Sequence, residues 1–427
     1  MQTRLICRRG GAAIAFACFA IAAFGQHYSL RMLVPLASRS HDASSANSID
    51  TAGDVVGTSF SSSAARVPAG ITRLADGTHF DMGTLADCFP FGGSGLSDVS
   101  PGGKIAGATS SICGGFSLAV TGSVSNPGAY ITFPPLPGGG DSAAYGANEN
   151  SVVGWSNTTT GCGGFLCTQT AARPMKWYGP TTAVELSRGP FLVAIASGVN
   201  ANGVVVGRAY PVADANSQVA VRWDFDSANP IPLPAVNGAY SDGEKISENG
   251  VVVGQSAVGT ERHATRWIGL SPTDLGAIAG HTYSIAYDIN DSQGIVGQSK
   301  ASADATTGIA VLWRDGQIID LNTLVANSGG AVLSTANGIN SRGWIAATGV
   351  FEGKVRGFVL VPCQGDLNDD GLVDDADFVI FVAAYNILDC ADAAMPEHCP
   401  SDLNRDGQVD DADFVLFVKA YNDLVCP

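Results

Sequence analysis

The sequence predicts a mainly β protein: a seven-bladed β-propeller-like repeat domain over 26–362, followed by a small α calcium-binding domain over 363–427. Three observations carry this prediction. A phrase ending in Val-Val-Gly or a relative of it recurs about every 48 residues, and a Trp-ending strand recurs in a second phase. A twelve-residue Asp-rich loop occurs twice near the C-terminus. Internal periods of this length are typical of solenoids and propellers.

The first 25 residues have the pattern of a secretory signal peptide. Three arginines precede an apolar run over 11–24, and Ala23-Phe24-Gly25 has the small-x-small pattern of a cleavage site. The run is short for a membrane anchor, and the stretch before Cys18 is too brief for a lipoprotein signal. We therefore expect a secreted chain, extracellular or at the cell surface, with no membrane span after cleavage.

The repeated phrase predicts two strands joined by a polar turn. In one unit, strands are expected at 284–289, 294–298, 309–314 and 317–321, with a hairpin turn at Asp315-Gly316. Four short antiparallel strands in 45–50 residues make up one propeller blade. A β-solenoid or a pair of sandwiches is the alternative, although solenoid rungs are shorter. The copies end at Gly57, Gly107, Gly154, Gly207, Gly254, Gly297 and Ala346.

The second phase confirms the register of the repeat. The aromatic residues that end its strands are Trp177, Trp223, Trp267, Trp313 and Phe358. Their position inside a strand favours a core role over stacking on sugars. The last repeat lacks a fourth strand after residues 355–361, and residues 32–36 resemble that strand. An N-terminal strand could therefore complete the last blade and remove a sheet edge.

These residues resemble the HAF family of extracellular repeats, whose units carry an Ile-Asn…Gly…Val-Val-Gly phrase and a Trp-ending strand. The resemblance covers about residues 30–361 and is clearest in the fourth to sixth repeats. It implies a secreted repeat fold and does not indicate an activity.

The two C-terminal loops, 366–377 and 402–413, have the spacing of a calcium loop. Oxygen side chains fall at loop positions 1, 3, 5, 9 and 12, with Gly371 or Gly407 at position 6. Ca²⁺ binds six to eight oxygens, and this spacing supplies five side chains and one carbonyl. A solvated Asp-rich turn could imitate one copy, but not two in fixed register. We expect two bound Ca²⁺ ions.

An amphipathic helix is expected after each loop, about eight residues long and marked by aromatic residues at helical spacing. Helices this short need a partner, so we expect the two aromatic faces to pack together. The apolar positions are Phe378, Phe381, Val382 and Tyr385 in the first helix, and Phe414, Phe417, Val418 and Tyr421 in the second.

The duplicated loop and helix resemble a type I dockerin, a family that docks onto cohesin modules of a scaffold. The resemblance implies a cohesin-like or cell-surface scaffold partner, backbone carbonyls of Leu372 and Gln408 as ligands, and side-chain ligands at the other loop positions. Position 10 holds Asp375 or Asp411, near where this family places hydroxyl residues for partner recognition. The side-chain ligands would be Asp366, Asn368, Asp370, Asp374 and Asp377, and Asp402, Asn404, Asp406, Asp410 and Asp413.

Ten cysteines fit an exported protein. Four of them bracket the calcium loops, and the simplest of three connectivities is Cys363–Cys390 with Cys399–Cys426. A zinc site is the alternative, but the spacing is not that of zinc ligands. The cysteines of the repeat domain are Cys88, Cys113, Cys162 and Cys167.

Charge excludes one class of partner and motifs identify no enzyme. The net charge of −16 lies mostly after residue 362, where 15 acids face two bases. No basic patch exists, so nucleic acid is not expected, and no catalytic motif occurs. We expect a non-catalytic binding or display protein. The alternatives are a polysaccharide-degrading enzyme, with acids clustered in the ring, and a purely structural matrix protein. A binder would show exposed aromatics there, with polysaccharide as a partner.

Overall fold

The computed structural model describes residues 28–61, 69–73, 76–82, 94–110, 117–126, 129–158, 172–211, 217–226, 228–325, 328–363, 365–368, 373–396, 399–404 and 406–423. The predicted signal peptide, the four cysteines of the repeat domain, Asp370 and Leu372 lie outside these residues. The mainly β class is confirmed, since strands fill most of the described chain and the described α-helices occur only near its C-terminus.

The strands form five four-stranded sheets and one eight-stranded sheet. The first three sheets comprise β2 (Ala43–Ile49), β3 (Val55–Phe60), β4 (Ala69–Arg73) and β5 (His79–Asp81); β6 (Ser94–Val99), β7 (Lys104–Ser110), β8 (Ser117–Ser123) and β9 (Ile131–Phe133); and β10 (Ser142–Ala147), β11 (Val152–Ser156), β12 (Arg173–Gly179) and β13 (Thr182–Glu185). The fourth sheet comprises β14 (Val193–Val199), β15 (Val205–Tyr210), β16 (Val219–Trp223) and β17 (Ile231–Leu233).

The eight-stranded sheet consists of two antiparallel groups that a single parallel pair, Arg262 with Tyr283, joins. Its groups are β18 (Ser241–Ile246), β19 (Val252–Val258), β20 (Glu261–Ile268) and β21 (Ser271–Gly276), then β22 (Tyr283–Ile289), β23 (Ile295–Lys300), β24 (Ile309–Arg314) and β25 (Gln317–Asp320). The last sheet holds β26 (Val332–Ile339), β27 (Ile345–Phe351), β28 (Lys354–Pro362) and β1 (Tyr28–Leu33). Short 3₁₀ helices occupy Ala37–Arg39 and Leu321–Thr323.

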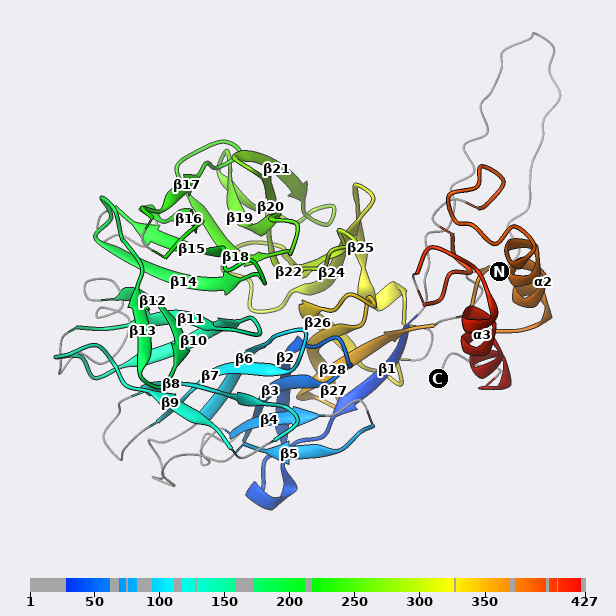
Figure 1. Ribbon diagram of the computed structural model, residues 1–427, viewed down its shortest axis with the longest axis horizontal. Helices are drawn as coiled ribbons and strands as arrows, with labels where there is room; N and C mark the ends of the chain where they lie inside the picture. Colours follow the sequence, from blue (N-terminus) through cyan, green and yellow to red (C-terminus); the bar gives the residue numbers. More distant parts are fainter. Residues whose placement is uncertain are drawn as a thin grey trace, which may run out of the picture.

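The groups follow one another in chain order around a common centre (Figure 1). The first strand of each group, here called a leading strand, packs on three strands of the preceding group. The leading strand β2 packs in the same way on β26, β27 and β28, which brings the first group against the last. The arrangement is therefore propeller-like. The leading strands are β2, β6, β10, β14, β18, β22 and β26.

The N-terminal strand completes the last sheet, as the sequence predicted. β1 pairs with β28 in antiparallel fashion, from Tyr28 opposite Pro362 to Leu33 opposite Gly357. The strand lies a few residues earlier than the predicted 32–36. The Ser44 hydroxyl of the first group donates to the carbonyl of Leu33 at 2.7 Å, which adds a buried bond across the junction.

The repeated glycine allows a close approach between the first two strands of a group. A Cβ at Gly57, Gly154 or Gly207 would lie 2.0 Å from a carbonyl oxygen of the neighbouring leading strand, which no side chain tolerates. In the last group Ala347 takes this place, and β26 shows a second register shift there, between Leu333 and Thr335. The predicted core role of the strand-ending aromatics is confirmed: Trp177, Trp223, Trp267, Trp313 and Phe358 are all buried.

The asparagines that follow the leading strands β10, β14, β22 and β26 link neighbouring groups. The Nδ2 atoms of Asn148 and Asn290 donate to the carbonyls of Asn200 and Asn340, at 2.7 and 2.9 Å. Asn340 in turn donates to the carbonyl of Asp50 in the first group, at 2.8 Å. The Oδ1 atom of Asn340 accepts the backbone N–H of residue 344 within its own turn. This double use explains why Asn recurs in the phrase.

The C-terminal segment forms two helices, α2 (Asp375–Tyr385) and α3 (Asp411–Asp423), which lie beside each other (Figure 1). Both are longer than the eight residues expected. The predicted aromatic packing is confirmed: the rings of Phe381 and Phe417 stack with centroids 4.9 Å apart, and both are buried. No helix within the described ranges is both long and apolar enough to cross a bilayer.

The predicted disulfide pairing is wrong. Cys390 bonds Cys399, with their Cα atoms 5.5 Å apart, and Cys363 forms a disulfide with a partner outside the described residues. The segment after α2 runs back along the second loop, where the backbone N–H of Val409 donates to Leu388 at 2.7 Å. The N–H of Cys390 likewise donates to the carbonyl of Gly407, so this pairing carries Cys390 away from the first loop and toward Cys399.

Candidate functional site

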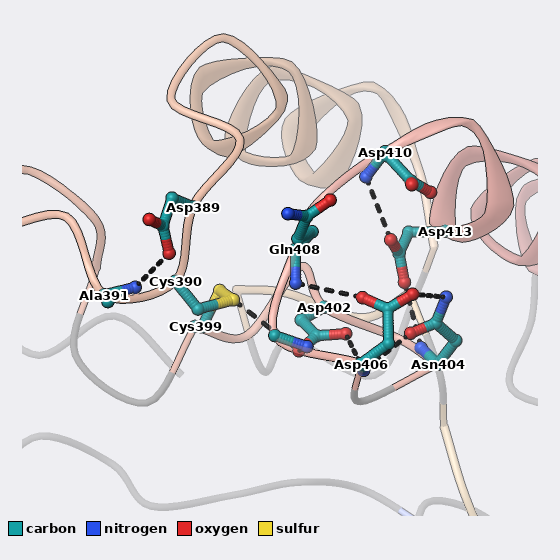
Figure 2. The surroundings of a disulfide bond; sticks show 11 residues. Asp389, Cys390, Ala391, Cys399, Asp402, Asn404, Asp406, Gln408, Asp410 and Asp413 are labelled. Atoms are coloured by element: carbon teal, nitrogen blue, oxygen red, sulfur yellow. Dashed lines mark hydrogen bonds between the residues drawn. A yellow bond between two sulfur atoms is a disulfide. The ribbon is translucent and has the colours of Figure 1, made fainter.

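The second predicted calcium loop, 402–413, gathers its oxygen side chains around one centre. Figure 2 shows the carboxyl groups of Asp402, Asp406 and Asp413 and the amide of Asn404 close together. Asn404 Nδ2 lies 2.9 Å from an oxygen of Asp406. The two oxygens of Asp402 accept the backbone N–H groups of Asp406 and Gly407, at 3.2 and 2.9 Å. These bonds fold the loop tightly around its acidic residues.

Position 12 is fully buried in each loop. Asp377 and Asp413 have no exposed surface. One oxygen of Asp413 accepts the N–H of Asn404 at 2.9 Å, and the other accepts the N–H of Asp410 at 3.0 Å. Asp377 accepts from Leu367 and from Asp374 in the corresponding way. Each carboxylate is therefore hydrogen-bonded both to the backbone near the start of its loop, at position 2 or 3, and to the backbone of position 9.

Position 9 caps the helix that follows. Asp374 is the N-cap of α2, accepting the N–H of Ala376 at 2.8 Å, and forms a capping box with Asp377. Asp410 accepts the N–H of Ala412 in the second loop at the same distance. Part of the acidic pattern therefore has a local structural role.

The donor set nevertheless fits a Ca²⁺ ion. An ionised carboxylate has about four lone-pair sites, and Asp413 uses two of them for N–H groups. The described part of the first loop has no basic side chain, and all its polar side chains bear oxygen. The structure places Asp366, Asn368, Asp374 and Asp377 in the first loop. It places Asp402, Asn404, Asp406, Gln408, Asp410 and Asp413 in the second.

The position 10 aspartates have partners within the chain. The Tyr385 hydroxyl of α2 donates to Asp411 at 2.5 Å, and the Tyr421 hydroxyl of α3 donates to Asp375. A tyrosine of each helix is thereby hydrogen-bonded to the first residue of the other helix. These two residues are engaged in the packing of the helix pair.

One further group near the second loop resembles a metal site without being one. Cys390, Cys399 and Asp402 lie close enough to share an ion. The two sulfurs are bonded to each other, so neither is a thiolate that could ligate a metal.

A polar cavity lies at the centre of the β domain, and the sequence did not predict its lining. Every leading strand has a β-bulge at the same place, shown by a register shift against the second strand of its group. The bulged residues all line one cavity of about 470 Å³, together with Asp98, Arg208 and Lys245. They are Asn47, Ser97, Tyr145, Ser197, Glu244, Tyr287 and Asn337.

Lys245 crosses the centre of the β domain. Its Nζ lies 2.5 Å from Asp98 Oδ1, so it joins the leading strands β18 and β6. Burial works against its charge, but Asp98 and Asp288 outweigh burial and raise the pKa of Lys245. Lys245 also borders a second cavity of about 430 Å³ on the side of the Asn turns. The lysine therefore lies between the two cavities.

Acidic side chains in and beside the cavity lie close to Arg208. Arg208 Nη1 lies 3.6 Å from Asp242 and 3.8 Å from Glu244. Burial, with Asp242 next to it, raises the pKa of Glu244 to about 7, and burial raises the pKa of Asp288 to about 6. The cavity thus contains both signs of charge in close association.

No protein-family model matches this chain, and no curated protein matches it. Among solved structures, the chain is similar to a mutant of the Aleuria aurantia lectin in complex with alpha-methyl-L-fucoside, at 11% identity and TM-score 0.36. That match covers 69% of this chain and 94% of the lectin. It is also similar to a putative TolB from Agrobacterium tumefaciens, at 12% identity and TM-score 0.35, over 69% of this chain and 88% of that one. TM-scores this low carry no argument about function.

Proposed function

We propose that this chain is a secreted, non-catalytic binding protein with a seven-bladed propeller and a calcium-dependent attachment module at its C-terminus. The observation that carries the proposal is the central polar cavity, because one residue from every leading strand reaches it. Seven leading strands, each packed on the preceding group, support seven blades and a closed ring. Concave sites of this size that present placed polar groups are where proteins bind small ligands.

In the attachment module, each loop would hold one Ca²⁺ ion. Asp366, Asn368, Asp374 and Asp377 would contribute oxygens in the first loop, with Asp370 and the Leu372 carbonyl. Asp402, Asn404, Asp406, Asp410, Asp413 and the Gln408 carbonyl would do so in the second. The bound ion would supply the positive charge that holds several carboxylates together. Buried Asp377 and Asp413 support this assignment, because their bonds already orient them across the loops.

The attachment partner is proposed to be a cohesin-like protein or a cell-surface scaffold. Because Asp375 and Asp411 are bonded to tyrosines of the opposite helix, the partner would be recognised by other residues of the pair. Val379 and Val415 occupy equivalent places in the two helices and are 68% and 67% exposed. They offer an apolar contact on each helix.

Calcium titration of the full-length protein by calorimetry tests the attachment module. We expect two ions per chain, and one ion after Asp406→Ala. Asp389→Ala is the matched control, because Asp389 lies outside both loops and its side chain accepts only the local N–H of Ala391 among the bonds described. The assignment fails if no calcium binds, or if Asp406→Ala still binds two ions.

A second candidate, a polysaccharide-degrading enzyme, is favoured by one observation. Glu244 lies in the cavity with a pKa raised to about 7, as a general acid requires. Hydrolysis of neutral polysaccharides that is lost in Glu244→Gln would support the enzyme. Binding of a ligand without turnover would support the binding protein.

A further inference from the structure

We infer that the seven bulged residues form a single recognition ring, and that its ligand is a small, neutral, hydroxyl-rich molecule of the sugar class. This inference rests on the proposed binding function and adds its site and ligand chemistry. The bulged residues are Asn47, Ser97, Tyr145, Ser197, Glu244, Tyr287 and Asn337.

The bulge recurs in every leading strand, whereas the side chain of the bulged residue varies. Each bulged residue lies three residues before the polar turn residue of its group, as Ser197 lies before Asn200 and Tyr287 before Asn290. An Ala, Leu or Gly precedes it in every copy. A bulge re-aims the side chain of its extra residue. The same turn of the backbone thus directs seven side chains of four kinds (Asn, Ser, Tyr and Glu) into one cavity.

The recognition ring consists almost entirely of hydrogen-bonding side chains. Six of its seven members are Asn, Ser or Tyr, each of which can donate and accept. Ser197 is 7% exposed, and its Oγ has no hydrogen-bond partner among the described residues. A buried hydroxyl without a partner is costly, so it indicates a group that a ligand would satisfy. The Tyr145 oxygen accepts Trp155 Nε1 at 3.0 Å, which leaves its own proton to donate.

The charged side chains of the cavity are already paired with each other or with neighbouring acids. The two bases of the cavity, Arg208 and Lys245, already lie beside acids. Asp98 and Glu244 would repel an anionic ligand, and the two bases would repel a cationic one. A neutral ligand with many hydroxyls can bond to this lining without displacing an ion pair. The volume, about 470 Å³, lies within the usual range for small ligands, roughly 300–1,000 Å³.

Two members of the ring also have a structural role. Asn47 Nδ2 donates to the Leu96 carbonyl, and Asn337 Nδ2 donates to the Ala46 carbonyl, both at 2.6 Å. These amides link neighbouring groups, so changing them would disturb the ring itself. Ser197 and Tyr287 are better test positions. Ser197→Ala breaks no hydrogen bond to the described residues, and Tyr287→Phe keeps the ring of the side chain.

The test is a binding measurement by calorimetry and saturation-transfer NMR on the calcium-loaded full chain. The probes are glucose, galactose, mannose and xylose, with choline as a cationic probe and inorganic phosphate as an anionic probe. We expect at least one sugar to bind in the millimolar range or tighter. Ser197→Ala and Tyr287→Phe should each weaken it about 3- to 10-fold, as the loss of one hydrogen bond does. Tyr178→Phe is the control, because Tyr178 is exposed and bonds Asp226 outside the cavity.

The possible results separate this inference from the proposed function. If a sugar binds equally well to both variants, the ring is not the site. If choline or phosphate binds and no sugar does, the ligand class is wrong while binding in the cavity stands. If no probe binds, the inference and the binding role of the propeller both fail. The calcium titration judges the attachment module separately.

Discussion

The ion pair across the centre of the β domain provides the sharpest test of the fold. Lys245→Met would keep most of the aliphatic volume and remove the charge beside Asp98 and Asp288. Asp98 is 3% exposed at its side chain, and Asp288 is 7% exposed. Removing one partner of a buried pair costs roughly 3–5 kcal/mol, because the other charge stays buried.

The expected magnitude follows from the bonds that remain. Asp98 would still accept the Ser48 hydroxyl at 2.7 Å and the N–H of Ala147 at 2.9 Å. Because these bonds satisfy part of its charge, the loss should lie at the lower end, about 3 kcal/mol. Asp98→Asn in the same chain should recover at least half of it, since the uncharged amide can accept the Ala147 N–H through its oxygen and donate to the Ser48 hydroxyl oxygen through its NH₂.

The assay is urea denaturation followed by tryptophan fluorescence, because buried Trp223 and Trp267 report directly on the core. Lys354→Met is the matched control: its ion pair with Asp42 is exposed, and such pairs contribute about 0–1 kcal/mol. If Lys245→Met lowers the free energy of unfolding no more than Lys354→Met does, Lys245 does not hold the centre together as described.

Three further predictions concern the repeat and the cavity. Gly254→Ala should destabilise the protein by about 1–3 kcal/mol in the same assay, because its Cβ would lie 2.0 Å from a carbonyl. Gly179→Ala, with open space around it, should change stability by less than about 0.5 kcal/mol. Asn340→Ala removes a bond to the first group and two bonds within its turn, and should cost about 2–4 kcal/mol by denaturation, against less than about 1 for exposed Asn202→Ala. Because Glu244 binds its proton more tightly in the folded state, its contribution to stability is complete below pH 4.5 and is lost as the pH rises to about 7. Denaturation at several pH values should show this decline, and Glu244→Gln should reduce it, leaving the part that Asp288 contributes through its own raised pKa; an unchanged slope would refute the assignment.

The repeat could be predicted from sequence because the residues that build it recur. The close strand approach admits only Gly at positions such as Gly207, and the group-linking bond requires an amide such as that of Asn200. Trp223 and its equivalents recur because each fills the same space in the core. The N-terminal strand was recognisable by its likeness to the strand that the last repeat lacks.

The cavity lining escaped prediction for a physical reason. The backbone fixes the place of a bulged residue, whereas nothing in the fold fixes its side chain, so the ring leaves no recurring letter in the sequence. The signal that could have found it is positional: three residues before the polar turn. The disulfide was mispredicted because equal spacing suggested two equivalent brackets, whereas the strand-like pairing of Leu388 with Val409 breaks that equivalence.

The pairing of β1 with β28 has a consequence for how the chain reaches its final form. The contact from Tyr28 to Pro362 joins residues about 330 positions apart. A contact so distant along the chain pays a large loop-closure entropy and forms late and slowly. Because β1 pairs with β28, the first and last strands of the repeat domain lie side by side. A short covalent link between them would turn this distant contact into a local one. A circular permutant opened at the Asp315-Gly316 hairpin would then place β24 and β25 at opposite ends of the chain, so that their pairing would become the most distant contact.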